Sequence, residues 1–152
     1  MKVTSPRTLF LLFLIFLGSC DGNRVYEEFQ DIPSQVWSIN DSLVFQLPEL
    51  EVSDKTGLLG IRFKESYSFT NFYVKLISQD SSGLILDEKL VNMVLFDPKS
   101  GKPQGKGFGD TFTSYDTLDF HFPPETKKIT LLQYMREEQL SGIEAVGLKI
   151  IK

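Results

Sequence analysis

The chain has 152 residues, a formal net charge of −4 and a single cysteine, and 41% of its residues are hydrophobic. An acidic chain of this size lacks the basic surface that nucleic-acid binding requires, and one cysteine cannot form a disulfide within the chain. Thirteen phenylalanines, five tyrosines and one tryptophan favour strands over helices.

The N-terminal segment has the features of a secretion signal. Lys2 and Arg7 supply positive charge, and an apolar run of nine residues follows over positions 9–17. This run is short for a membrane-spanning helix, which needs about 20 apolar residues. Residues 17–20 (Leu-Gly-Ser-Cys) resemble the lipobox of bacterial lipoproteins. We therefore predict that residues 1–19 are a signal peptide and that Cys20 carries a covalent lipid, with no other cofactor.

The remaining chain has the size of one domain. Removing residues 1–19 leaves 133, enough to bury about two thirds of the unfolded surface, and losing Lys2 and Arg7 lowers the net charge from −4 to −6. Residues 20–34 are mostly polar and are predicted to be a lipidated tether. Residues 35–152 are predicted to form the folded domain, which has no thiol left for catalysis or metal binding.

Strand patterns follow one another along this domain. They are predicted over residues 42–47, 58–64, 72–77, 91–96, 118–122, 129–134 and 145–150. One short C-terminal helical turn is predicted around Arg136 to Leu140, ended by Gly142. About seven to eight short strands without a long helix predict an all-β fold, a single antiparallel β-sandwich.

Few residues are available for catalysis. His121 is the only histidine, and we interpret it as a half-exposed polar residue of a strand. Asp110, Asp116 and Asp119 are candidates for acid–base work on a glycan, although acidic residues in loops are usually only solvated. No catalytic residue and no metal site are predicted.

Residues 105–110 (Gly-Lys-Gly-Phe-Gly-Asp) have glycines at a spacing similar to that of a phosphate-binding loop. Such a loop needs a following helix whose N-terminal N–H groups converge on the anion. No helical pattern follows here. A long hairpin loop is predicted instead.

Several stretches resemble the GldH family of gliding-motility lipoproteins, from the lipobox nearly to the last residue. They include the aromatic segment 67–73, the glycine-rich loop 101–110, the stretch 133–136 and the later stretches 140–143 and 146–148. The Pro103-Gln104 pair departs from the bulkier apolar residues expected before the glycines. Beyond Cys20, the residues that carry the likeness are Trp37, Tyr67, Asn71, Gly105, Gly107, Gly109, Gln133, Met135, Arg136, Leu140 and Gly142.

The resemblance implies a lipoprotein of the outer membrane that is needed for gliding and linked to the type IX secretion machinery. It implies no catalytic residues, so the expected role is non-enzymatic assembly or support of an envelope complex. The expected partners are the membrane, through the lipid, and proteins of the gliding and secretion apparatus. The periplasmic face of the outer membrane is favoured over the cell surface.

Alternatives remain open at this stage. The C-terminal residues are interpreted as holding the corners of the sandwich, with Arg136 satisfying strand-end carbonyls, in preference to binding a partner. The Asn71 amide is expected to bond local backbone. For the function, a carbohydrate-binding module with exposed aromatic side chains is the main alternative, and a lipid-anchored glycan hydrolase is the third.

Overall fold

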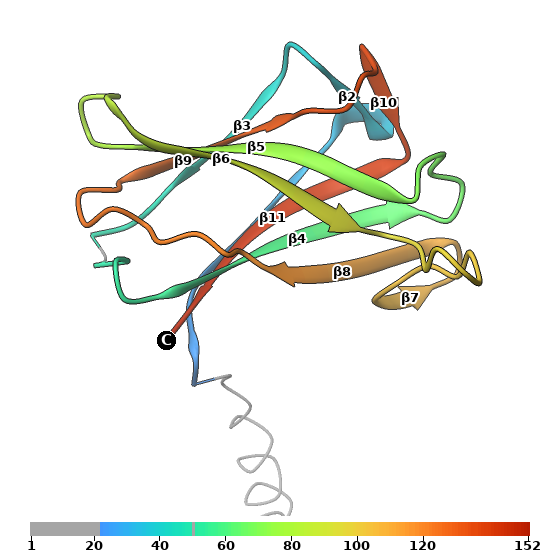
Figure 1. Ribbon diagram of the computed structural model, residues 1–152, viewed down its shortest axis with the longest axis horizontal. Helices are drawn as coiled ribbons and strands as arrows, with labels where there is room; N and C mark the ends of the chain where they lie inside the picture. The colour runs from blue at the N-terminus through green and yellow to red at the C-terminus, as the bar shows by residue number, and fades with distance from the viewer. Residues whose placement is uncertain (1–21, 50) are drawn as a thin grey trace, which may run out of the picture.

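A computed structural model describes residues 22–49 and 51–152, and the predicted signal and Cys20 lie outside these residues. Figure 1 shows two twisted antiparallel sheets packed face to face, with a short two-stranded ribbon at one end. The predicted all-β antiparallel sandwich is confirmed.

The larger sheet contains the N-terminal and C-terminal strands. Its order is β1-β11-β4-β8-β7, so neighbours in space are far apart in the chain, except β7 and β8, which form a hairpin. The bounds are β1 Arg24–Asp31, β4 Thr56–Lys64, β7 Lys106–Phe108, β8 Thr111–Thr117 and β11 Ile143–Ile151.

The smaller sheet has the order β3-β9-β5-β6, and β10 pairs with β2 in the separate ribbon. Their bounds are β2 Val36–Ser38, β3 Ser42–Gln46, β5 Asn71–Gln79, β6 Ile85–Val94, β9 Lys128–Gln133 and β10 Gln139–Ser141. The helical turn η2 covers Pro33–Gln35. Within the described ranges, no helix is long and apolar enough to cross a membrane.

The core lies between the two sheets because alternate residues of each central strand point inward. On β5, for example, Phe72, Val74 and Leu76 are fully buried while the residues between them are half-buried. The facing strand β4 contributes Leu59, Ile61 and Phe63, all with no exposed surface. Aromatic and branched side chains therefore fill the interior, as the composition indicates.

The predicted strand over 118–122 is wrong, and the strand of this region is β8, which ends at Thr117. Leu118, Phe120 and Phe122 are all buried, so the alternating pattern identified the inward side chains correctly. Alternation reports burial, however, and does not show whether a partner strand is available. Here the segment closes the side of the core without joining a ladder.

Two other expectations also need correction. The predicted helical turn over 136–140 is absent, because residues 139–141 form β10 and pair with β2. Residues 24–31 of the predicted tether form β1, which pairs with β11 along its length. Both segments carry several polar residues, and tertiary pairing decides their conformation.

Candidate functional site

Most of the residues singled out in the sequence gather where the β2–β10 ribbon joins the sandwich. Leu140 lies opposite Trp37 in the ribbon, and both side chains are buried to about 1% exposure. The Trp37 ring packs on Phe72 with centroids 5.8 Å apart, and its Nε1 donates to the Asp41 carbonyl at 3.1 Å. Trp37 and Leu140 therefore attach the ribbon to the core.

Gly142 turns the chain from β10 into β11. Its φ is +90°, and a Cβ added there would lie 3.1 Å from the Tyr67 Cα. The Tyr67 hydroxyl donates to the Asn71 carbonyl at 3.1 Å, and burial raises the pKa of Tyr67. The Asn71 amide donates to the Asn92 side chain at 2.8 Å, whereas local backbone was expected. This corner is thus a packed turn.

Gln133 organises the turn after β9. Its side chain is 1% exposed, and its Nε2 donates to the Glu137 carbonyl at 2.7 Å. Its Oε1 accepts from the Met135 N–H at 2.9 Å, and the Met135 sulfur lies 3.3 Å from the Tyr73 N. One buried amide therefore satisfies two backbone groups and fixes how residues 134–137 leave the sheet.

Arg136 does not have the role that the sequence suggested. It is exposed, and within the described residues it makes no hydrogen bond or ion pair. In this turn it is Gln133 that donates to a backbone carbonyl, that of Glu137. This frees Arg136 to act on something outside the chain.

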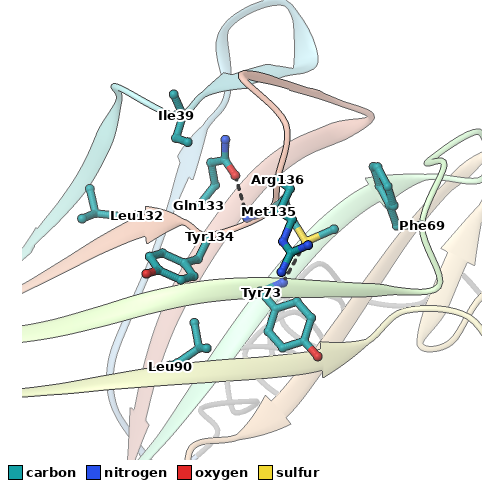
Figure 2. Close-up of a pocket in the computed structure, with 9 residues that line it drawn as sticks. All are labelled: Ile39, Phe69, Tyr73, Leu90, Leu132, Gln133, Tyr134, Met135 and Arg136. Atoms are coloured by element: carbon teal, nitrogen blue, oxygen red, sulfur yellow. Dashed lines mark hydrogen bonds between the residues drawn. The ribbon is translucent and has the colours of Figure 1, made fainter.

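A hollow of about 880 Å³ opens on the outer face of the four-stranded sheet, beside this turn (Figure 2). It lies beside residues 133–136, where the Tyr134 N–H bonds the Tyr73 carbonyl of β5, and extends to Leu90 of β6. It is lined by Ile39, Phe69, Tyr73, Leu90, Leu132, Gln133, Tyr134, Met135 and Arg136.

The lining is mostly apolar and carries one charge. Tyr134 is 58% exposed, Leu90 50% and Ile39 46%, so large apolar surfaces face solvent here. Gln133 already uses its amide within the chain, and among the described residues no carboxylate lines the hollow. Arg136, whose side chain points over Met135 and Tyr73 in Figure 2, is the only charged group of the lining.

The glycine-rich motif lies elsewhere, in the β7–β8 hairpin. Gly107 faces Phe112, and a Cβ on it would meet that ring at 2.3 Å. Gly105 and Gly109 have φ of +91° and +65°, and Gly109 belongs to the hairpin turn. The glycines are therefore explained by the geometry of the hairpin. A hairpin is present as predicted, but the long loop is wrong, because residues 106–108 form β7 and only Gly109 and Asp110 make the turn. Sequence reasoning missed Phe108, which is 94% exposed at the tip.

The acidic candidates do not converge. Asp110 lies just before β8 and pairs with Lys64 at 3.1 Å, while Asp119 lies beyond its other end and pairs with Lys89 at 3.1 Å. Asp116 is exposed between them. Within residues 22–49 and 51–152, no cluster of His, Cys, Asp and Glu is arranged to hold a metal ion.

These features define a small antiparallel β-sandwich with an aromatic-lined hollow. A family model for the GldH lipoprotein matches residues 24–150. The chain is 27% identical over 155 positions to the gliding motility lipoprotein GldH of Flavobacterium johnsoniae, covering 93% of each protein. It is 29% identical over 156 positions to a GldH homolog of Christiangramia forsetii, covering 95% of this chain and 93% of the relative. The chain belongs to the GldH lipoprotein family.

Among solved structures, the K1 cleaved adhesin domain of Lys-gingipain from Porphyromonas gingivalis is similar over 89% of this chain and 86% of that domain. The sequence identity is 13% and the TM-score is 0.38. A TM-score this low does not establish a shared fold.

Proposed function

We propose that this protein supports gliding motility and the associated type IX secretion machinery as a non-enzymatic assembly component of the outer membrane. Its membership in the GldH lipoprotein family supports the link to gliding, because two relatives bear that function in their names. A lipid on Cys20 holds it to the membrane, with the periplasmic face favoured. The hollow beside Arg136 is its binding surface for a protein partner.

The observation that carries the binding role is the composition of the hollow. Gln133, Met135 and Arg136 belong to the stretch that resembles the family, and all three line it. Around them lie tyrosine, leucine and isoleucine side chains with half of their surface in solvent. Protein interfaces are enriched in Tyr, Met and Arg and depleted of acidic residues, and this lining has that composition.

The first prediction tests the hollow in cells. Tyr134→Asp should abolish spreading of a gliding strain, because removing an aromatic side chain from the centre of an interface costs about 2 kcal/mol or more, or roughly 30-fold in affinity. The protein level and melting temperature should stay near those of the wild type, since the Tyr134 side chain is more than half exposed. Colony spreading and thermal unfolding of purified protein are the measurements.

Leu84→Asp is the matched control. Leu84 is 63% exposed and lies in the turn after β5, at the other end of that strand from Tyr73. It should leave spreading unchanged. Normal spreading of the Tyr134→Asp strain at a normal protein level would contradict the proposed function of the hollow.

The carbohydrate-binding alternative receives less support. Its best stacking platform would be tryptophan, but Trp37 is buried in the core. Gln133 is the only amide in the lining, and its hydrogen bonds are taken by the backbone. Sugar sites combine aromatic faces with several polar groups that fix the hydroxyls, and here the side chains left for that task are Arg136 and the Tyr73 and Tyr134 hydroxyls.

A further inference from the structure

The two outer faces of the sandwich differ in how their apolar side chains are covered. On the five-stranded sheet, Phe29, Gly147, Gly60 and Tyr115 form one row across four strands. The Phe29 ring lies over both glycines, and Tyr115 meets it edge-on with centroids 5.9 Å apart. Apolar groups on this face therefore pack against each other.

Charged groups complete the cover on that face. The Tyr115 hydroxyl donates to Glu27 at 2.8 Å, and Arg24 pairs with the same carboxylate at 2.9 Å. The Arg62 guanidinium lies 5.3 Å from the Phe29 ring centroid, and Lys149 lies 5.7 Å from that of Tyr115. The apolar side chains on the outer face of the five-stranded sheet are thus covered by other groups of the same chain.

Within residues 22–49 and 51–152, nothing covers the outer face of the four-stranded sheet in this way. Leu90, Lys75 and Leu132 form one row across β6, β5 and β9, and Tyr134 follows beside Tyr73, to whose carbonyl its N–H donates at 2.9 Å. Residues opposite each other in a ladder share a face, so the two leucines and two tyrosines form a largely apolar floor, in which the aliphatic stem of Lys75 lies between the leucines. Large exposed apolar patches on folded domains often mark interaction sites.

The two lysines beside Leu90 are paired, and the exposed Glu137 and Glu138 that follow Arg136 do not line the hollow. Lys75 pairs with Glu88 at 2.6 Å and Lys89 pairs with Asp119 at 3.1 Å. Arg136 remains, so the hollow presents an apolar surface with one net positive charge. A guanidinium matches a carboxylate in a two-pronged geometry that neither a neutral group nor an amine can reproduce.

We propose that the hollow docks a segment of a partner protein that combines apolar side chains with a carboxylate, which pairs with Arg136. This rests on the proposed function, in which the hollow is the binding surface, and adds the chemistry of the occupant. A membrane surface fits less well, because the net charge of −6 without the signal repels anionic lipid and the site is concave.

The test is selection from a random peptide library on the full lipidated protein in lipid nanodiscs, with empty nanodiscs as the counter-selection. The selected peptides should contain Asp or Glu, or depend on a free C-terminal carboxylate, together with Leu, Phe or Tyr. Arg136→Gln should weaken the best peptide about tenfold or more, while Arg136→Lys should retain part of the affinity. Lys106→Gln, at an exposed lysine of β7, should have no effect.

Charge reversal makes the test sharper. Selection on the Arg136→Glu protein should yield basic peptides in place of acidic ones. Failure to select any peptide, selection of neutral or basic peptides by the wild type, or affinity that survives Arg136→Glu would overturn the proposal. A wild-type dimer in sedimentation that Tyr134→Asp dissociates would also overturn it, because the occupant would then be a second copy.

The motility assay separates the two proposals. If Tyr134→Asp abolishes spreading while Arg136→Glu spreads normally, the hollow is a binding surface but carboxylate docking is wrong. If both variants spread normally while acidic peptides bind the hollow in vitro, the chemistry of the site stands and its role in gliding fails.

Discussion

Gly147 shows how much one missing side chain matters on the covered face. A Cβ placed there would lie 2.7 Å from two atoms of the Phe29 ring, closer than real contacts allow. Alanine normally favours a strand over glycine by about 0.5–1 kcal/mol, but crowding a packed site costs about 1–3 kcal/mol. The cost of crowding should therefore exceed the gain from the better strand preference of alanine.

Gly147→Ala is therefore expected to lower the free energy of unfolding by roughly 1–2 kcal/mol, measured by chemical denaturation. The control is the same change in a Phe29→Ala background, where no ring remains to be displaced. There the substitution should be neutral or slightly stabilising. Equal destabilisation in both backgrounds would show that the ring is not the cause.

Gln133 and Arg136 illustrate what sequence reasoning resolves at the scale of residues. The stretch 133–136 was singled out from the sequence, and all four of its residues line the hollow. The division of roles within it was not predictable, because a glutamine and an arginine both supply suitable donors. Burial decides: the shorter amide is enclosed and bonds the backbone, while the longer cation reaches solvent.

At the scale of elements, β1 is the largest departure from expectation. Its sequence mixes Glu27 and Glu28 with Val25, Tyr26 and Phe29, so neither face reads as apolar. The strand is stable because β11 supplies a full antiparallel ladder and because Glu27 finds partners on β11 and β8. Such partners are set by the tertiary fold, and periodicity within one segment cannot reveal them.

The Glu27 cluster predicts how acid affects the fold. Burial alone raises the pKa of Glu27, but hydrogen bonds from Arg24 and Tyr115, with the charge of Lys149, outweigh it and lower the pKa. The folded state then binds the proton more weakly than the unfolded state does. The resulting stabilisation is present above the unfolded pKa, about 4.3, and is lost as the pH falls through the lower folded value.

Wild-type stability should therefore fall from pH 5 to pH 3 more steeply than that of Glu27→Gln, which has no such proton to take up. Denaturant midpoints at pH 7, 5, 4 and 3 are the measurement. Parallel pH profiles for the two proteins would mean that Glu27 does not contribute to acid sensitivity.

The fold class of the whole molecule was predictable from the sequence, whereas the features of its surface were less so. Short strands of aromatic and branched residues were enough to indicate the sandwich, and five of the seven predicted strands overlap β3, β4, β5, β9 and β11 closely. The hollow was not predictable, because Ile39, Tyr73 and Leu90 join the 133–136 turn from three separate segments. Strand register brings them together, and one sequence does not specify it.

The anchor gives a prediction at the same scale. Cys20→Ser removes the only thiol of the chain, so the protein should no longer incorporate an alkyne fatty acid or remain in the membrane fraction. Gel fluorescence after metabolic labelling and fractionation are the measurements. Labelling of the variant equal to that of the wild type would show that Cys20 is not the site of lipidation.

With the proposed lipid on Cys20, the early start of β1 would determine how far the domain can move from the membrane. Only residues 21–23 separate Cys20 from Arg24, and such a span reaches at most about 14 Å when fully extended. The domain would then stay close to the lipid surface and could not sample positions far from it. The eight residues of β1 run roughly 26 Å from this anchored end toward the end where Ile39 lines the hollow. A partner would therefore meet the hollow at a nearly fixed height above the bilayer.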